Sequence, residues 1–409
     1  MVKFDRWSKA SIESVLKYRR IVILAGPRQC GKTTLAKEFI SDNTLYCTLD
    51  DPVMLEAAQS DPGGFLKHTK NLMIIDEIQR APLLLNRIKK IVDEDTRPGQ
   101  FLLTGSSNIQ SLPGVTESLA GRIKKLRLRP LSEGEIKGKS PKFLECAFAG
   151  LFEDNYANDT QDAIIDIACR GGFPEAVKLE ERRQRLSWHK DYVESLIERD
   201  LKDILNIRRQ DAMQELLLVL ASWSSKFMDI SHICSGLSIQ RPTVESYINA
   251  LEALFLFERV RPWIKTDYDR VGKHAKLFMT DSGLMASILN WHIDDIKFDS
   301  DKLGKLIETF VFNQLAAQID LSDRKYTLYQ YRDREKREID FLIEREDGSL
   351  LGIEVKAGSA INKNSFKNLI WFKENLAKEK PFSGIVLYTG EFSLSFGDKM
   401  WAVPISALW

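Results

Sequence analysis

The sequence lacks the features that mark disulfide-rich secreted proteins and membrane-spanning proteins. Its five cysteines are scattered among 409 residues, with no Cys-x-x-Cys pair and no histidine at zinc-ligand spacing, so we expect free thiols in a reducing compartment. The longest apolar runs, such as IVILA and LLLVLA, are far shorter than the roughly 20 residues of a membrane span. The charged amino terminus lacks the apolar segment of a signal peptide. We therefore expect a soluble, cytoplasmic protein with no membrane partner.

The sequence also has no excess of charge of one sign. Its 59 basic and 58 acidic residues leave a formal net charge of +1, so that any contact with nucleic acid must be made by a local patch. The chain of 409 residues is longer than one hydrophobic core usually organises, which predicts several domains. Apolar runs alternate with helical segments in the first 130 or so residues, which predicts a parallel α/β sheet. The runs expected to form its strands are residues 21–25, 44–50, 71–76 and 100–105.

A phosphate-binding loop follows the first of these runs. The stretch GPRQCGKT, from Gly26 to Thr33, matches the pattern G-x-x-x-x-G-K-[ST] at every specified position. Glycines let the backbone curl so that N–H groups point at phosphate oxygens, Lys32 supplies a positive charge, and the Thr33 hydroxyl is a magnesium ligand. The residues predicted to bind the nucleotide are Gly26, Pro27, Arg28, Gln29, Cys30, Gly31, Lys32, Thr33 and Thr34.

Two acidic residues end the third apolar run. In LMIIDE, Asp76 is placed to hold Mg²⁺ and Glu77 to activate the water that attacks the γ-phosphate of ATP. The alternative is that both carboxylates only cap the next helix. The loop and the acidic pair together predict ATP and Mg²⁺ as cofactors.

Further catalytic residues are expected after the fourth run. The stretch FLLTGSSN presents polar side chains near Glu77, and we assign Asn108 to the γ-phosphate or the attacking water, with helix capping as the alternative. Arg122 or Arg129 is a candidate arginine finger that acts on a second copy of the chain, which requires a homo-oligomer. The alternative for each arginine is a solvated position on the surface.

The motifs GPRQCGKTTL, IIDEIQ, LLTGSS, SLAGR and RGGFPEA, in this order, resemble a prokaryotic branch of AAA-type ATPases. The resemblance covers nearly the whole chain, and members often carry a C-terminal domain of unknown function. In related signal-transducing ATPases a Gly-x-Pro contacts the adenine, which implies Pro174 here, with Arg170 beside it as a phosphate sensor. The alternative for GGFP is an ordinary turn.

Residues 229–262 resemble a winged helix-turn-helix. Apolar residues of its second helix predict a buried stripe made of Val244, Ile248, Leu251 and Leu254. A helix that reads DNA exposes polar or basic residues near its start, and this one offers Gln240, Arg241 and Asn249 but also Glu245. DNA contact and packing against protein therefore both remain open.

The stretches REIDFLIE and LLGIEVKAG predict two strands of a hairpin joined by the turn EDGS. Alternation places Ile339, Phe341 and Ile343 on one face of the first strand and Asp340 on the other. In the second strand, Glu354 and Lys356 share a face. Asp340 and Glu354 could then share a hard cation, with Lys356 orienting the attacking water. Plain surface pairing is the alternative.

Glu308, on a predicted amphipathic helix, adds a third carboxylate. The set Glu308, Asp340 and Glu354-Val-Lys356 resembles the PD-(D/E)XK nuclease superfamily. That resemblance implies Glu308, Asp340 and Glu354 as metal ligands, and Asp340, Glu354 and Lys356 as catalytic residues.

The sequence therefore predicts an α/β protein with a P-loop NTPase core, a helical lid, a winged-helix module and a C-terminal α/β nuclease-like domain. The predicted boundaries are 1–150, 151–210, 211–275 and 276–409. We expect a protein that binds and hydrolyses ATP and whose nucleotide state controls a DNA-acting nuclease-like domain. The alternatives are a nucleotide-gated signalling or scaffold protein whose nuclease-like domain binds a protein partner without cutting, and a DNA-binding regulator acting through the winged helix.

Overall fold

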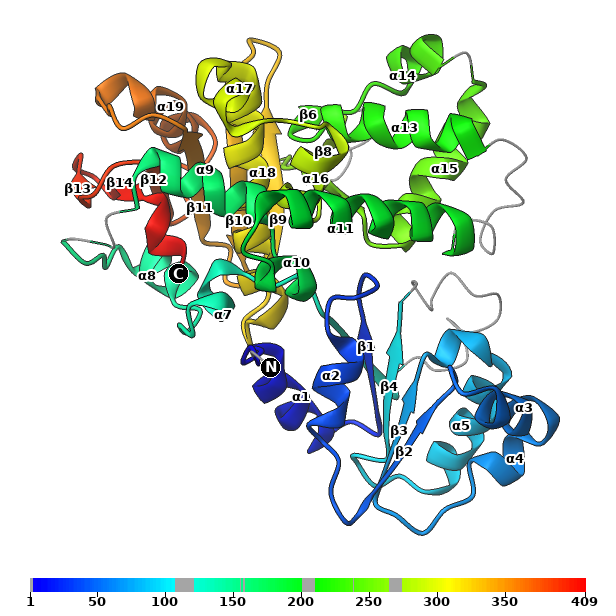
Figure 1. The fold of residues 1–409 in the computed structure, drawn as a ribbon. Helices are drawn as coiled ribbons and strands as arrows, with labels where there is room; N and C mark the ends of the chain where they lie inside the picture. Colours follow the sequence, from blue (N-terminus) through cyan, green and yellow to red (C-terminus); the bar gives the residue numbers. More distant parts are fainter. Residues whose placement is uncertain are drawn as a thin grey trace. The chain divides into compact units, whose positions relative to one another are not determined.

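The computed structural model describes residues 3–106, 121–154, 156, 159–200, 210–237, 239–264 and 274–409. The chain divides into two compact units (Figure 1). Unit 1 comprises Met1–Leu131 with Leu251–Leu256, and unit 2 comprises Ser132–Ala250 with Phe257–Trp409. Within the described residues, no helix has the length and apolar character needed to cross a membrane.

Unit 1 is built on a five-stranded sheet with the order β2-β3-β4-β1-β5, and every strand pairs in parallel with its neighbour. The strands are β1 (Ile21–Ala25), β2 (Thr44–Thr48), β3 (Leu72–Asp76), β4 (Phe101–Gly105) and β5 (Ile123–Arg127). The four predicted strands and the α/β fold class are thus confirmed. Because β4 lies between β1 and β3, the segments that follow β1 and β3 emerge on either side of it at the carboxyl edge of the sheet, where open α/β sheets bind ligands.

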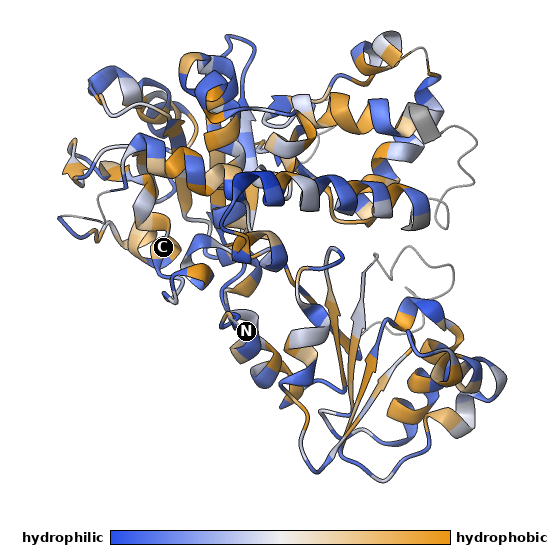
Figure 2. Cartoon of the chain, in the orientation of Figure 1, coloured by the Kyte–Doolittle hydropathy of each residue, from blue (hydrophilic) through white to orange (hydrophobic). Residues whose placement is uncertain are grey.

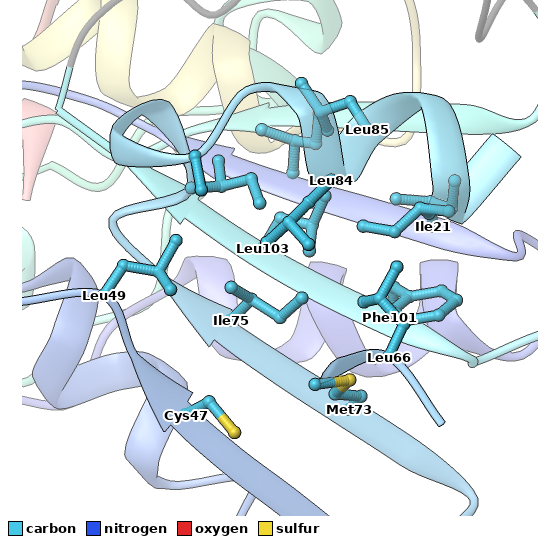
Figure 3. Close-up of a cluster of buried hydrophobic side chains, with 14 of the residues drawn as sticks. Ile21, Cys47, Leu49, Leu66, Met73, Ile75, Leu84, Leu85, Phe101 and Leu103 are labelled. Atoms are coloured by element: carbon cyan, nitrogen blue, oxygen red, sulfur yellow. The ribbon is translucent and has the colours of Figure 1, made fainter. Parts of the chain in front are cut away.

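Helices cover both faces of this sheet. They are α1 (Ser8–Leu16), α2 (Lys32–Lys37), α3 (Pro52–Ser60), α4 (Pro62–Phe65) and α5 (Leu83–Glu94). On one face, Leu84 and Leu85 of α5 pack with Ile75 and Leu103 of the strands (Figure 3). On the other face, Ile12 of α1 belongs to a second buried cluster with strand residues. The inner strands β1, β3 and β4 can be buried on both faces because they consist mainly of hydrophobic residues (Figure 2).

Unit 2 combines helices with a nine-stranded mixed sheet. The helices that precede β7 in the chain are α7 (Glu133–Ile136), α8 (Phe143–Ala149), α9 (Gln161–Arg170), α10 (Pro174–Lys178), α11 (Arg182–Ser195), α13 (Gln210–Ser222), α14 (Ile230–Leu237) and α15 (Arg241–Ala253). Four more follow, namely α16 (Ser282–Ile288), α17 (Ile293–Phe298), α18 (Ser300–Leu321) and α19 (Lys367–Asn375).

The sheet of unit 2 has the order β13-β14-β12-β11-β10-β9-β7-β8-β6. Its strands are β6 (Lys226–Phe227), β7 (Phe257–Pro262), β8 (Lys276–Met279), β9 (Tyr326–Arg332), β10 (Glu338–Arg345), β11 (Leu350–Lys356), β12 (Phe382–Tyr388), β13 (Leu394–Ser395) and β14 (Met400–Pro404). A short parallel pairing, Arg261 with Tyr329 and Pro262 with Gln330, joins β7 to β9. The predicted boundary between residues 275 and 276 therefore falls inside one continuous sheet, and the division of residues 151–409 into three domains stays a prediction.

The predicted hairpin is present, but the predicted alternation of β10 is wrong. Strands β10 and β11 pair antiparallel, with Phe341 opposite Ile353. The register of β10 against β9 shifts between Ile339 and Leu342, which is the signature of a β-bulge. Ile339 and Leu342 consequently belong to one buried cluster, while the Phe341 ring stacks with Phe312 of α18. The helix α18, which runs along that face of the sheet, confirms the predicted helix that carries Glu308 (Figure 1).

Candidate functional site

The loop between β1 and α2 has the backbone that a phosphate-binding loop needs. Gly31 has a φ of 99°, in the left-handed region that glycine adopts without strain, and it caps the amino end of α2. A Cβ atom on Gly26 would lie 2.1 Å from the carbonyl oxygen of Leu128, so only glycine fits there. Both glycines are therefore required by the local geometry.

Lys32 lies under this loop. Its side chain is buried, and the Nζ atom donates to the carbonyl oxygens of Gly26, at 3.1 Å, and Pro27, at 2.7 Å. Two carbonyl oxygens of the loop thus hold the positive charge of Lys32 against it. Of the other predicted loop residues, Cys30 is buried with its thiol 3.6 Å from the Leu128 carbonyl oxygen, and Gln29 and Thr34 are exposed.

Thr33 and Asp76 meet at the carboxyl edge of the sheet, as predicted for a magnesium pair. The Thr33 hydroxyl lies 3.0 and 2.9 Å from the two carboxylate oxygens of Asp76. Asp76 is 2% exposed and also accepts hydrogen bonds from Thr104 and, at 3.3 Å, from the Tyr46 hydroxyl. Burial and then the charge of Asp76 raise the pKa of Tyr46, so that its hydroxyl stays a donor. Three hydroxyl groups thus hold the Asp76 carboxylate in place.

Glu77 directly follows the carboxyl end of β3, and its backbone has a left-handed conformation with a φ of 60°. Its carboxylate accepts a hydrogen bond from the Gln79 amide and one of 3.3 Å from the Ser106 hydroxyl, and Gln79 also donates to Ser106. Its backbone N–H donates to the Thr104 hydroxyl at 3.1 Å. Sequence reasoning missed Gln79 and Thr104, although Gln79 stands two residues after Glu77 in the quoted motif IIDEIQ.

A second cluster of charged residues lies in unit 2, where the sequence predicts a metal site. The Lys276 ammonium lies 2.5 Å from Glu308 Oε1, 2.9 Å from Glu338 Oε1 and 3.5 Å from Asp340 Oδ1. Its side chain is only 2% exposed. Burial by itself lowers the pKa of Lys276, but the charges of Glu308, Asp340 and Glu338 together raise it above its usual value. Lys276 is thus a buried, charged partner of two predicted metal ligands.

The remaining predicted residues of this cluster lie next to it. Asp340 Oδ2 accepts a hydrogen bond of 2.9 Å from the backbone N–H of Val355, which ties β10 to the segment that carries Glu354 and Lys356. The Lys356 ammonium donates to Glu354 Oε2 at 3.3 Å. Burial, and then the charge of Asp340, raise the pKa of Glu354, and burial likewise raises the pKa of Glu308. The structure thus brings the predicted carboxylates close together, with a lysine between Glu308 and Asp340 that the sequence analysis missed, and their roles as metal ligands stay a prediction.

Comparison with known families identifies the domain that contains the first site. The family described as AAA domain matches residues 18–137, the segment that contains the loop, Asp76, Glu77 and all five parallel strands. These residues are an AAA-type P-loop ATPase domain. Two families described as domains of unknown function match residues 161–295 and 303–408 of the rest. The second of these contains Glu308, Asp340, Glu354 and Lys356.

Two relatives that are described as uncharacterized proteins match nearly the whole chain. A protein of Mycobacterium tuberculosis is 27% identical over 98% of this chain and 83% of its own length. A protein of Methanocaldococcus jannaschii is 21% identical over 97% of this chain and 89% of its own. Among solved structures, the Holliday junction branch migration motor RuvB of Thermotoga maritima is 21% identical over 63% of this chain and 90% of that one, with a TM-score of 0.31. A likeness that distant carries no argument about this ATPase.

Asn108, Arg122 and Arg129 are the other catalytic candidates predicted for the AAA domain. Asn108 lies outside the described residues, and its role stays a prediction. Arg122 precedes β5 at the amino edge of the sheet, opposite the phosphate loop, and its guanidinium binds both carboxylate oxygens of Asp93. Within its own unit Arg122 therefore does not reach the loop, and its role toward a second copy stays a prediction. The side chain of Arg129, the alternative finger, is buried.

The Gly-Gly-Phe-Pro turn is built into unit 2. Pro174 is the first residue of α10, and the N–H of Gly172 donates to Asp281 at 2.7 Å. Arg170, the predicted phosphate sensor, instead forms an ion pair with the buried carboxylate of Glu133. The alternative interpretation of a structural turn accounts for these contacts, and contact of Pro174 with adenine stays a prediction.

Two of the polar residues offered for DNA contact, Arg241 and Asn249, are paired with a neighbouring side chain. Arg241 forms an ion pair of 2.8 Å with Glu245, and Asn249 accepts a hydrogen bond of 2.8 Å from Arg259. The stripe residues Val244 and Ile248 are buried, as predicted. The side chains therefore leave little positive charge at the start of this helix, and the DNA-reading role stays a prediction.

Magnesium fits one of the two predicted sites. At the AAA domain, the Thr33 hydroxyl and the Asp76 carboxylate supply the oxygen ligands that Mg²⁺ prefers, beside a loop that binds phosphate. In unit 2, the positive charge against Glu308 and Asp340 belongs to Lys276, so the residues as they are arranged do not fit a dication. Among the described residues, no group of three or more His, Cys, Asp or Glu side chains is arranged to hold a metal ion.

Proposed function

We propose that this protein binds and hydrolyses ATP with Mg²⁺ at the AAA domain, and that its nucleotide state controls a nuclease-like C-terminal domain. The observation that carries the proposal is the contact between the Thr33 hydroxyl and both carboxylate oxygens of Asp76, directly beside the phosphate loop. These are the two side chains that hold magnesium in P-loop ATPases.

The chain's own residues divide the work of hydrolysis. Lys32, held at the loop, neutralises charge on the β- and γ-phosphates. Glu77 accepts the proton of the attacking water, and Gln79 and Ser106 fix the orientation of its carboxylate. Magnesium, when bound with ATP, supplies further charge stabilisation. The buried strands beneath Asp76 keep the site rigid.

For the C-terminal domain, the structure supports the partner-binding form of the proposal. The Lys276 contacts to Glu308 and Asp340 place a positive charge where a nuclease needs its dication. In this arrangement the domain acts by binding another protein or DNA without cutting. Cleavage of DNA is the second candidate, because Asp340 is tied at Val355 to the strand that carries Glu354 and Lys356, the other predicted catalytic groups. Assembly into a homo-oligomer remains part of the proposal through Arg122.

Nucleotide binding tests the first half of the proposal. Binding of a fluorescent ATP analogue by the Lys32→Ala protein should be lost, because the charge at the loop is removed. The matched control is Lys37→Ala, an exposed lysine in the last turn of the same helix, which should bind as the parent does. Equal binding by the Lys32→Ala protein would show that this loop does not hold the nucleotide.

A cleavage assay separates the two forms of the C-terminal domain. Single-stranded, duplex and branched DNA are incubated with Mg²⁺ or Mn²⁺, with and without ATP, alongside the Asp340→Ala protein. The binding form predicts no cutting while ATP is hydrolysed. Cutting that is lost in the Asp340→Ala protein would establish the nuclease, and a dependence on ATP would show that the two sites communicate.

A further inference from the structure

The ammonium of Lys276 occupies the centre of a carboxylate cluster drawn from separate elements. Glu308 comes from α18, Glu338 and Asp340 come from β10, and Lys276 comes from β8. Glu308 and Asp340 are two of the carboxylates that the sequence assigns to a metal. The lysine therefore bridges the same groups that a dication would bridge.

The surroundings of Lys276 fix its side chain in this position. Strand β8 pairs antiparallel with β6, which places Lys276 opposite Phe227. The ammonium lies 5.6 Å from the centre of the Phe227 ring and 5.9 Å from that of Phe278. Aromatic rings and carboxylates thus enclose the charge, and both favour a desolvated cation. An ammonium buried this completely is stable only because the carboxylates pair with it.

The cluster has more carboxyl groups than ammonium groups. Its four carboxylates, Glu308, Glu338, Asp340 and Glu354, face the two ammonium groups of Lys276 and Lys356. Glu354 is 6% exposed, and its Oε1 atom is buried without a hydrogen-bond partner. A carboxylate oxygen in that state points to a site that favours a further positive charge. Without Lys276, the cluster would have the charge and the oxygen atoms of a divalent-cation site.

We infer that Lys276 is a built-in counter-cation that excludes a divalent metal from the carboxylate cluster of Glu308, Asp340 and Glu354. The inference rests on the proposed nuclease-like C-terminal domain and concerns the regulation of its site. An ammonium and a dication cannot both occupy the space between Glu308 and Asp340, because they would repel each other at contact distance. The domain is therefore a metal-free module while β8 keeps its place in the sheet.

The exclusion of the metal by Lys276 depends on one short strand pairing in the sheet. Strands β6, β7 and β8 connect to the rest of the sheet through the short pairing of β7 with β9. Lys276 lies on this smaller part, whereas the carboxylates lie on β10, β11 and α18. Displacement of the smaller part would withdraw the ammonium and leave the carboxylates in place. The metal site would then form without any change in its own strands.

Binding of Mn²⁺, measured by electron paramagnetic resonance without nucleotide, tests the inference. All proteins carry Asp76→Asn, which removes the magnesium ligand of the AAA domain. The Lys276→Met protein should bind Mn²⁺ at the cluster with an affinity at least on the order of 100-fold above that of the parent, whose binding there should stay undetected. Lys305→Met is the matched control, because Lys305 is also a buried lysine with a carboxylate partner, Asp301, and it should gain nothing. Adding Asp340→Asn to Lys276→Met should abolish the new site.

Two outcomes would overturn the inference. One is a folded Lys276→Met protein that binds Mn²⁺ no better than the parent. The other is a parent protein that already binds Mn²⁺ in a manner lost with Asp340→Asn, and this arm holds even if Lys276→Met does not fold. A second variant, Lys276→Gln, keeps a polar side chain and should also gain the site. Because ATP plays no part in the readout, failure of this test leaves the proposed ATPase untouched, and failure of the ATPase leaves this test valid.

Discussion

The Thr104 hydroxyl donates to the carboxylate of Asp76 and accepts the backbone N–H of Glu77 at 3.1 Å. Thr104 is fully buried in β4, between the strand that leads into the phosphate loop and the strand that ends in the acidic pair. One side chain on a third strand thus fixes the predicted metal ligand Asp76 and the predicted catalytic base Glu77 relative to each other. This contact explains why the two acids keep separate directions although they are adjacent in sequence.

Replacing Thr104 with valine tests this contact. Thr104→Val keeps the shape of the side chain but leaves a buried N–H without a partner and Asp76 with one donor fewer. We expect a loss of about 1–3 kcal/mol in the free energy of unfolding, measured by urea denaturation, together with slower ATP hydrolysis. Thr48→Val is the control, because the Thr48 hydroxyl lies 3.5 Å from Asp76 and contributes less. Equal losses in the two variants would contradict the special role of Thr104.

Gln79 is predicted to position the catalytic base. Gln79→Leu removes the amide that donates to Glu77 and Ser106, so the Glu77 carboxylate gains freedom to rotate away from the water. We expect kcat for ATP hydrolysis to fall by about tenfold while KM for ATP stays nearly constant. The control is Gln59→Leu, whose exposed amide bonds only to the Arg80 carbonyl oxygen. A rise in KM without a fall in kcat would instead mean that Gln79 contributes to nucleotide binding.

Gly171 is predicted to be irreplaceable in the turn before α10. It has a φ of 72°, and a Cβ atom would lie 2.3 Å from a carboxylate oxygen of Asp281. Asp281 caps α16 by accepting the N–H of Leu284 at 2.7 Å, so a displaced carboxylate would also weaken that cap. We expect Gly171→Ala to lower the melting temperature, with a cost of about 1–3 kcal/mol from the backbone alone.

For a second glycine, Gly304, we expect substitution by alanine to increase stability. Gly304 lies inside α18, and nothing lies within 4 Å of the position of an added Cβ atom. Gly304→Ala should stabilise the protein by about 0.5–1 kcal/mol, because alanine favours the helix. If both substitutions had the same effect, the clash with Asp281 would not be the cause.

The stability of unit 2 is predicted to fall in mild acid because of His189. Burial, and then the charge of Arg185, lower the pKa of His189 to about 4 from an ordinary value of 6.5. Below pH 6.5 the unfolded chain therefore binds a proton that the folded chain does not accept until pH falls to about 4. The free energy of unfolding should drop across this window by up to about 3 kcal/mol.

Urea denaturation at several pH values measures this effect. The neighbouring Trp188, whose ring centre lies 5.2 Å from that of His189, provides a local fluorescence signal. His189→Gln should flatten the pH dependence between pH 6.5 and 4, whereas the exposed His292→Gln should keep it. An unchanged pH dependence in the His189→Gln protein would mean that other groups cause the acid sensitivity.

Much of unit 1 could be predicted from the sequence because its signals are local. The run 21–25 forms β1 within those bounds, since a continuous apolar stretch between polar residues has few alternatives to a buried strand. Lys32 and Thr33 could be picked out because the spacing of the loop motif is fixed, and the structure brings Thr33 to Asp76 as that motif predicts. Thr104 was not found, since its partners lie on another strand and nothing around it in sequence signals the contact.

The C-terminal cluster shows the limit of the same reasoning. Glu308, Asp340 and Glu354 were identified by type and order, but strict alternation put Asp340 and Phe341 on opposite faces. The bulge in β10 brings Asp340 toward Lys276 while Phe341 stacks on Phe312 of α18. Lys276 was missed because strand pairing brings it close to residues that are distant from it in the sequence. Its only local signal is a lysine at the head of the apolar run KLFM.

The Glu77→Gln protein provides the most direct test of the central claim, that this AAA domain hydrolyses ATP with Glu77 as the base. Glutamine keeps the size and hydrogen bonding of the side chain but cannot accept the proton of the attacking water. The measurement is steady-state ATP hydrolysis beside binding of a fluorescent ATP analogue. We expect the Glu77→Gln protein to bind the ATP analogue as the parent does and to hydrolyse ATP more slowly by about 10²–10⁴-fold. Hydrolysis at the parental rate would contradict the assignment of Glu77 and with it the proposed mechanism.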